Sequence, residues 1–203
     1  MIFSSFDFLF RFLPLFLILY FICPEKWRNQ CLFAGSLIFY FMDQTLPLIL
    51  SCSPFNTCKL FIGQLIGRKR DAKERSFWLN AGIFYNLFWL ILFKYSTFIT
   101  ENLNLLLSYT KQVCSFPFIR LSLPLGISFY TFQAIAYLAD VYRKEIRSEH
   151  SLLRFCTWFS MFTQATSGPI TRYQEIRSQL IRRRFSMDRL ETGLREFTIG
   201  LKP

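Results

Sequence analysis

Long apolar runs follow one another along most of this chain, and short basic segments separate them. The runs cover residues 6–23, 27–42, 46–66, 77–99 and 121–141. A helix rises about 1.5 Å per residue, so about 20 apolar residues cross the roughly 30 Å hydrocarbon core of a bilayer. The pattern predicts an all-α, polytopic membrane protein with about five spans, and a single membrane domain covering residues 1–203.

Composition supports this class and excludes others. Hydrophobic residues make up 52% of the 203 residues and aromatic residues 19%, more apolar surface than a soluble domain of this length covers. The formal charge of +11 comes from basic residues gathered between the apolar runs, without the motif of an RNA-binding module. We therefore predict the lipid bilayer as a partner and no nucleic acid.

Four connecting segments hold most of the charge and predict the orientation. They are PEKWRNQ, GRKRDAKER, YRKEIRSEH and TRYQEIRSQLIRRRF, at residues 24–30, 67–75, 142–150 and 171–185. The positive-inside rule places such segments in the cytoplasm. Alternation of the spans then places the N-terminus outside and residues 100–120 in an outer connection.

A sixth apolar run, residues 152–170, does not fit a simple crossing, because both of its flanks are basic. It also contains Gly168 and Pro169, which break a helix. We predict a re-entrant element that enters and leaves on the cytoplasmic side. Arg172 follows it and has two interpretations: a donor-side cation for an anionic substrate or carrier, or an ordinary cytoplasmic-flank arginine.

The last part of the chain predicts an amphipathic helix. Its apolar residues recur on one face: Met187, Leu190, Leu194, Phe197 and Leu201. The expected setting is the membrane surface, with a packing partner on another segment.

Metal and disulfide chemistry find no support in the sequence. The six cysteines form no C-x-x-C pair, and His150 is the one histidine. His150 sits in a hydrophilic loop beside Glu149, which favours a solvated histidine over a general base. We predict no metal site.

Polar residues mark the run at 123–146. On a helical wheel they fall within about 80° of one another: Gly126, Tyr130, Gln133, Tyr137 and Asp140. Polar groups facing lipid cost a few kcal/mol each, so this stripe points into the protein. Two interpretations stay open: hydrogen bonds between helices, with Asp140 paired to Arg143 or Lys144, or the lining of a tunnel.

Several segments resemble a known family. LPLGISFYTFQAIAYLADVYRKEI, SGPITRYQEIRSQLIRRRFS, WRNQCLFAGSLIFYF and FKYSTFITENLN are similar to the N-terminal portion of membrane-bound O-acyltransferases. The similarity points to the bacterial branch that includes the alginate O-acetyltransferase membrane subunit and the D-alanyl transfer protein of teichoic acid.

The resemblance implies a helical fold with a tunnel in the bacterial inner membrane. An acyl group would pass from a cytoplasmic thioester, acetyl coenzyme A or an acylated carrier protein, to a hydroxyl of an exported polysaccharide such as alginate. Candidate tunnel-lining residues are Tyr130, Gln133, Tyr137 and Asp140, and the candidate donor-side element is Gly168, Pro169 and Arg172. Periplasmic acyltransferase partners are implied, and no bound cofactor is.

The catalytic histidine of the family lies downstream of the part that this chain resembles, and His150 does not match it. We therefore expect the chain to be the N-terminal part of a larger acyltransferase, inactive alone. The alternative is a non-catalytic membrane relic or accessory subunit. The acceptor stays open among alginate, another exopolysaccharide, peptidoglycan and a teichoic acid.

Overall fold

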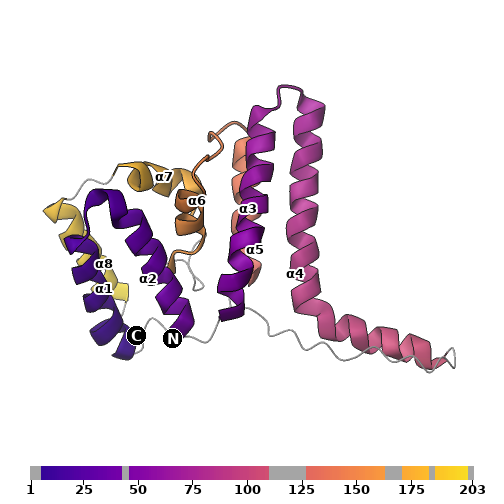
Figure 1. Ribbon diagram of the computed structural model, residues 1–203, viewed down its shortest axis with the longest axis horizontal. Helices are drawn as coiled ribbons and strands as arrows, with labels where there is room; N and C mark the ends of the chain where they lie inside the picture. Colours follow the sequence, from indigo (N-terminus) through magenta and orange to yellow (C-terminus); the bar gives the residue numbers. More distant parts are fainter. Residues whose placement is uncertain (1–5, 43–45, 110–126, 163–170, 183–185, 201–203) are drawn as a thin grey trace.

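The computed structural model describes residues 6–42, 46–109, 127–162, 171–182 and 186–200, and within these ranges it contains helices and no strands (Figure 1). A π-helical turn, η1 (Phe8–Phe12), leads into α1 (Leu13–Ile22), and a 3-10 turn, η2 (Glu25–Trp27), precedes α2 (Arg28–Met42). The remaining helices are α3 (Leu46–Arg68), α4 (Ala72–Tyr109), α5 (Ile127–Tyr142), α6 (Leu152–Phe159), α7 (Tyr173–Ile181) and α8 (Met187–Gly200). The all-α prediction is confirmed.

The first five helices coincide with the five predicted apolar runs. Among the described residues, one stretch, Ala72–Ser96 of α4, is both long and apolar enough to cross a membrane, and Phe8–Ile22 is apolar but shorter. The number of spans therefore stays a prediction.

α4 continues to Tyr109, so it extends into residues 100–120, which we predicted as an outer connection. Polar side chains there are satisfied within the helix: Thr100 donates to the Ser96 carbonyl at 2.9 Å, and Asn102 donates to the Phe98 carbonyl at 2.7 Å. Such bonds within one helix let polar residues continue it. The helix is therefore longer than its apolar run, and the side of the membrane on which residues 100–120 lie stays a prediction.

α7 lies inside a segment that we expected to be a basic connection. Tyr173 and Leu180 are buried, and Ile176 packs beside them on the same face. This i, i+3, i+7 pattern is a helical signal that the surrounding charges obscured. The predicted surface helix at the end of the chain is present as α8, and its described side chains are all exposed.

The helices form two groups. α3, α4 and α5 stand side by side, α1 and α2 form a second pair, and α6 and α7 lie between them (Figure 1). Aromatic rings fill the space around α6, with Trp158 5.0 Å from Tyr173 and Phe155 5.1 Å from Tyr137 between ring centroids. A second aromatic cluster joins η1, α2 and the residues after α6 through Phe12, Phe39 and Phe162.

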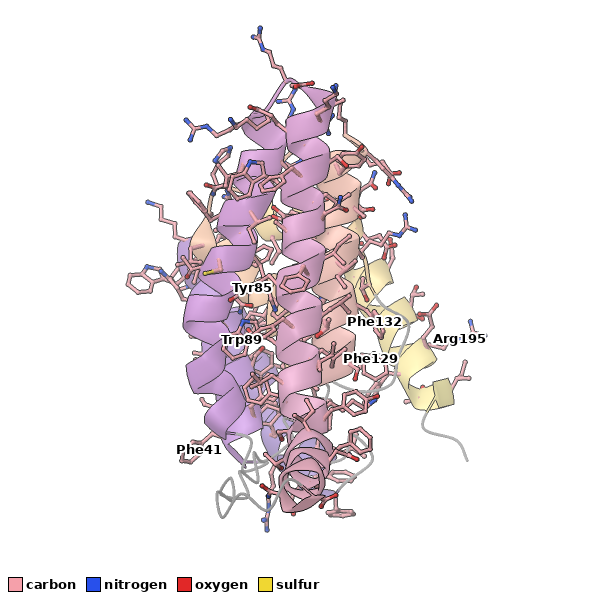
Figure 2. All side chains as sticks on the ribbon, turned by 90° about the vertical axis from the view of Figure 1, so that its right-hand side faces the viewer. Phe41, Tyr85, Trp89, Phe129, Phe132 and Arg195 are labelled. Carbon is pink, nitrogen blue, oxygen red and sulfur yellow. The ribbon has the colours of Figure 1, made fainter. Side chains whose placement is uncertain are left out.

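Large apolar side chains remain exposed on the outer faces of the helices. They include Phe10, Ile22, Phe84 and Phe88, and Figure 2 shows Phe41, Phe129 and Phe132 pointing away from the bundle. Soluble monomers rarely expose apolar surface of this extent, whereas lipid-facing helices do.

The described parts of the four basic segments lie at one end of the structure. The Asn29 side chain donates to the Leu180 carbonyl at 3.0 Å, and Arg172 lies 3.9 Å from Glu145. The α3–α4 turn meets the end of α5 through Arg75, which donates to the Val141 carbonyl at 3.3 Å. Figure 1 shows the α1–α2, α3–α4 and α5–α6 connections at this same end. The predicted topology requires this arrangement, and the assignment of that end to the cytoplasm stays a prediction.

Two glycines let α5 lie close to its neighbours. A Cβ on Gly63 of α3 would stand 2.7 Å from Cε1 of Tyr137, and a Cβ on Gly82 of α4 would stand 2.6 Å from Cδ1 of Leu138. Small residues at such contacts allow close helix packing. Together they bring α5 close to both α3 and α4, with Tyr137 directly against α3.

Replacing Gly63 by alanine is expected to lower the free energy of unfolding by about 1–3 kcal/mol, the usual cost of overpacking a buried contact. The Tyr137 ring is 1% exposed and has no room to move aside. Denaturant unfolding in mild detergent measures the change. The matched control is Gly193→Ala in α8, where a Cβ meets nothing within 4 Å, so helix propensity alone should give a gain of up to about 1 kcal/mol. Equal responses of the two variants would contradict the close contact.

Candidate functional site

The structure buries all the described members of the predicted stripe. Tyr130, Gln133, Tyr137 and Asp140 are 7%, 6%, 1% and 4% exposed, and we call them the α5 polar face. Gly126, which the same prediction included, lies outside the described residues. Whether this face lines a tunnel is a separate question, because burial alone also fits hydrogen bonding between helices.

Tyr130 lies at the end of the face away from the basic segments. Its hydroxyl hydrogen-bonds to the hydroxyl of Tyr40 in α2, and its ring lies 5.4 Å from that of Phe159. The ammonium of Lys59 stands 4.3 Å from the centroid of the same Phe159 ring.

We assigned Lys59 no functional role from the sequence. The structure places it well inside α3, with its ammonium against an α6 ring. A cation within an apolar helix that points toward the protein is by itself a signal of function, and its position in the run could have shown this.

Tyr137 connects α5 to the loop that follows it. Its hydroxyl accepts a hydrogen bond from the backbone N–H of Glu149 at 3.0 Å. Its ring contacts Phe155 of α6 and Tyr173 of α7, at 5.1 and 5.5 Å between centroids. This side chain therefore touches the elements on both sides of the predicted re-entrant run.

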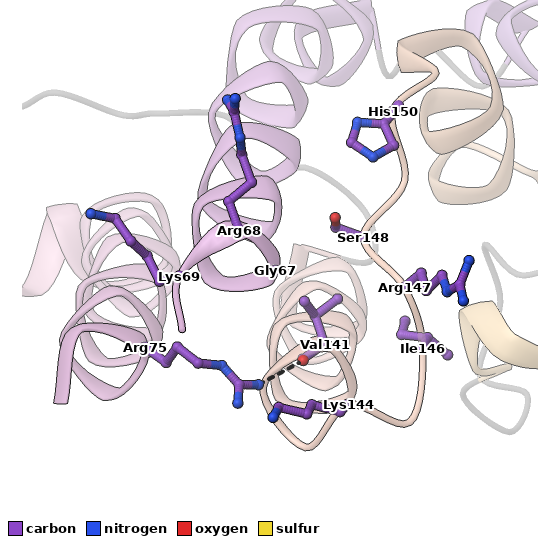
Figure 3. Close-up of a pocket in the computed structure, with 10 residues that line it drawn as sticks. All are labelled: Gly67, Arg68, Lys69, Arg75, Val141, Lys144, Ile146, Arg147, Ser148 and His150. Carbon is purple, nitrogen blue, oxygen red and sulfur yellow. Dashed lines mark hydrogen bonds between the residues drawn. The ribbon is translucent and has the colours of Figure 1, made fainter. Parts of the chain in front are cut away.

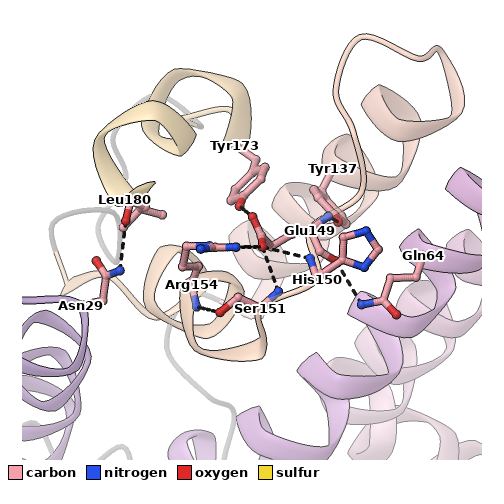
Figure 4. A network of polar contacts seen from close by, with 9 residues as sticks. All are labelled: Asn29, Gln64, Tyr137, Glu149, His150, Ser151, Arg154, Tyr173 and Leu180. Atoms are coloured by element: carbon pink, nitrogen blue, oxygen red, sulfur yellow. Dashed lines mark hydrogen bonds and ion pairs between the residues drawn. The ribbon is translucent and has the colours of Figure 1, made fainter. Parts of the chain in front are cut away.

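The carboxylate of Glu149 is the centre of a buried polar network (Figure 4). One oxygen accepts from the Arg154 guanidinium at 2.6 Å and from the backbone N–H groups of Ser151 and His150 at 2.8 and 2.9 Å. The other oxygen accepts from the Tyr173 hydroxyl. The side chain of Glu149 is 3% exposed, so these donors replace nearly all of its hydration.

The network fixes the charge states of its members. Burial by itself raises the pKa of Glu149, but the hydrogen bonds from Arg154, Tyr173 and the two amides outweigh it and lower the pKa from 4.5 to about 2. Burial and the neighbouring carboxylate raise the pKa of Tyr173, which therefore stays a donor. Glu149 is thus a charged, fully satisfied anchor at neutral pH.

Glu149 and Tyr173 lie on the two sides of the segment 150–172, and their hydrogen bond brings its ends together. Arg172, half-exposed, adds a looser contact to Glu145 at 3.9 Å. The chain therefore returns to the end of the structure from which α6 left it, as a re-entrant element requires. Gly168 and Pro169 lie outside the described residues, so the predicted break near the end of the run stays a prediction.

Asp140 stands at the basic end of the polar face without full compensation. Its Oδ2 atom is buried and has no hydrogen-bond partner among the described residues. Among the described residues, no ion pair joins Asp140 to Arg143 or Lys144. Arg143 instead lies 3.9 Å from Glu145, and the backbone turns at Lys144, whose φ is 64°.

Substituting Asp140 by asparagine is expected to raise the free energy of unfolding by about 1 kcal/mol, since it removes a buried charge whose hydrogen bonding is incomplete. The shape of the side chain is kept. Denaturant unfolding in detergent measures the gain, and Glu191→Gln on the exposed α8 is the control, expected within about 0.5 kcal/mol of the parent. A loss of stability in Asp140→Asn would instead mean that the Asp140 carboxylate makes a stabilising contact outside the described residues.

His150 is exposed, and its backbone N–H binds Glu149. Within the described ranges, no three His, Cys, Asp or Glu side chains lie close enough to hold a metal ion.

Comparison with known proteins identifies relatives over nearly the whole chain. A protein of Pseudomonas aeruginosa named "Probable alginate O-acetylase" is 36% identical over 98% of the chain, and its namesake of Azotobacter vinelandii is 34% identical over 98%. A peptidoglycan O-acetyltransferase of Helicobacter pylori is 29% identical over 99%. The chain covers 38%, 40% and 43% of these proteins, about two fifths of their length. No family model and no solved structure matches the chain. The predicted resemblance is confirmed.

Proposed function

Since this chain is a relative of alginate and peptidoglycan O-acetyltransferases, we propose that it forms part of a multi-pass acyltransferase of the bacterial inner membrane. The enzyme moves an acetyl or other acyl group from a cytoplasmic thioester to a hydroxyl of an exported polysaccharide. Acetyl coenzyme A or an acylated carrier protein is the proposed donor.

The α5 polar face is the observation that carries this proposal. From Tyr130 to Asp140 it extends about 15 Å along the helix axis, which is about half of the hydrocarbon thickness. Four buried polar side chains would destabilise a helix that packs only against apolar neighbours. Each such side chain costs free energy when its hydrogen bonding is incomplete. Passage of a polar thioester and its acyl group into the membrane requires such a lining.

The direction of this path follows from the charges. Its Asp140 end meets the basic segments, which we assign to the cytoplasm. Its Tyr130 end, with Tyr40 and Lys59 nearby, lies near mid-membrane. The proposed path thus opens toward the donor and covers the cytoplasmic half of the bilayer.

The acceptor chemistry needs a further group. Attack by a polysaccharide hydroxyl on a thioester is assisted by a general base, commonly a histidine. His150 is exposed in the α5–α6 loop and lies off the polar face. We propose that the base comes from a segment outside the 203 residues, so that this chain supplies the donor-side part.

A chimera tests the proposal. The region of the Pseudomonas aeruginosa protein that aligns with this chain is replaced by residues 1–203, and the chimera is expressed in a strain that lacks its own alginate O-acetylase. The expected result is O-acetyl ester on the alginate, measured after release by mild base. A chimera present in membranes at the parental level without any ester would contradict the proposal and favour a relic or accessory subunit. Ester formation by residues 1–203 alone would contradict the proposal that the general base comes from outside these residues.

A further inference from the structure

A strongly basic pocket lies where the α3–α4 turn faces the α5–α6 loop (Figure 3). Its volume is about 490 Å³, within the range of small-molecule sites. The titratable residues of its lining are Arg68, Lys69, Arg75, Lys144, Arg147 and His150. No aspartate or glutamate is among the described residues that line it.

Two of these cations already have structural partners. Arg75 is 8% exposed, donates to the carbonyls of Val141 and Tyr142, and so fastens α4 to the end of α5. Lys69 forms an ion pair with Glu74 at 3.1 Å.

Three of the other lining residues are cations without a counter-charge. Within the described part of the chain, no carboxylate forms an ion pair with Arg68, Lys144 or Arg147. Like charges that line one pocket repel one another, and an anion bound among them would relieve this repulsion.

The backbone is shaped to form the pocket. A Cβ on Gly67 would stand 2.7 Å from the Ser148 hydroxyl oxygen, so the absence of a side chain lets the loop approach α3. Lys144 adopts a φ of 64°, a left-handed conformation that is uncommon for residues with a side chain. This turn places Lys144 opposite Arg68 across the pocket.

We propose that this pocket binds a phosphate-bearing anion. Lysine and arginine are the usual phosphate ligands in proteins, through charge-assisted hydrogen bonds. The pocket also lies at the end of the apolar helices, with the exposed ring of Phe77 in the first turns of α4. Basic pockets between helices at this depth hold the headgroups of anionic phospholipids. A soluble phosphate ester would meet the same cations, so the experiment separates the two sources.

The experiment uses the full chain in nanodiscs and two triple variants of equal charge. The pocket variant carries Arg68→Gln, Lys144→Gln and Arg147→Gln. The control carries Lys26→Gln, Arg182→Gln and Arg195→Gln, which remove the same charge from exposed positions elsewhere. All six side chains are exposed, so both variants should unfold at temperatures close to that of the parent.

The lipid arm uses nanodiscs of mixed phosphatidylglycerol and phosphatidylcholine. Native mass spectrometry measures how much phosphatidylglycerol stays bound to each protein. The pocket variant is expected to retain at least about tenfold less than the parent and the control, because three phosphate contacts are lost. The soluble arm adds inorganic pyrophosphate to phosphatidylcholine nanodiscs and follows the unfolding temperature. If pyrophosphate raises the unfolding temperature of the parent and the control but not that of the pocket variant, a soluble phosphate ester is identified as the ligand. If both variants match the parent in both arms, or differ from it equally, the proposal is overturned.

Discussion

Glu149→Ala is expected to lower the free energy of unfolding by about 3–5 kcal/mol, the range found when one partner of a buried ion pair is removed. The substitution leaves Arg154 without its carboxylate at 2.6 Å, and it leaves the Tyr173 hydroxyl and two backbone N–H groups without an acceptor. Each of these donors is placed around an oxygen that would no longer exist.

Unfolding by denaturant in mild detergent measures this loss, and hydrogen exchange shows where it acts. Exchange should increase in α6 and α7, because Glu149 joins the two ends of residues 150–172, the segment that contains α6 and leads into α7. The matched control is Glu145→Ala, whose carboxylate is 38% exposed and makes contacts of 3.9 Å only. Exposed pairs of this kind contribute little, so the control should stay within about 0.5 kcal/mol of the parent. A Glu149→Ala protein as stable as this control would show that the network does not hold the fold together.

Acidification is expected to remove about 3 kcal/mol of stability through the same carboxylate. The folded state lowers the pKa of Glu149 from 4.5 to about 2, and each pKa unit corresponds to about 1.4 kcal/mol. Because the folded pKa is the lower one, the contribution is complete above pH 4.5 and disappears as the pH falls through 2. The free energy of unfolding should therefore decrease most steeply between these two values.

The control for the acid effect is Glu149→Gln, which cannot titrate at this position. Its stability should be lower at pH 7 and should depend less on pH between 4.5 and 2 than that of the parent. Parallel pH profiles for the two proteins would mean that other carboxylates cause the acid response.

Much of the architecture could be predicted from local patterns. Runs of apolar residues located α1 to α5, and the helical wheel showed that Tyr130, Gln133, Tyr137 and Asp140 share one face, which the structure buries. These features depend on the period of a single helix, so one segment of sequence contains the information.

The centre of the candidate site could not be predicted in the same way. The carboxylate of Glu149 gathers donors from the α5–α6 loop, α6 and α7, and Tyr137 of α5 completes the contact through the loop backbone. No spacing along the chain predicts that these residues come together around Glu149. We considered the neighbouring His150 as a general base, but the buried residue of the pair is Glu149. One feature of this region could be predicted locally, namely the start of α6. Ser151 caps this helix by accepting a hydrogen bond from the backbone N–H of Arg154 at 3.4 Å.

We propose that the α5 polar face lines the path of the acyl group. Within the chimera, Gln133→Leu changes this face with little change in volume, and Phe132→Leu changes the neighbouring side chain, which is 51% exposed on the outer surface. The measurement is the O-acetyl content of alginate at equal amounts of membrane-inserted chimera. We predict a loss of at least about tenfold for Gln133→Leu, equivalent to about 1.4 kcal/mol, and acetylation near the unsubstituted level for Phe132→Leu. Equal acetylation by the two variants would contradict the claim.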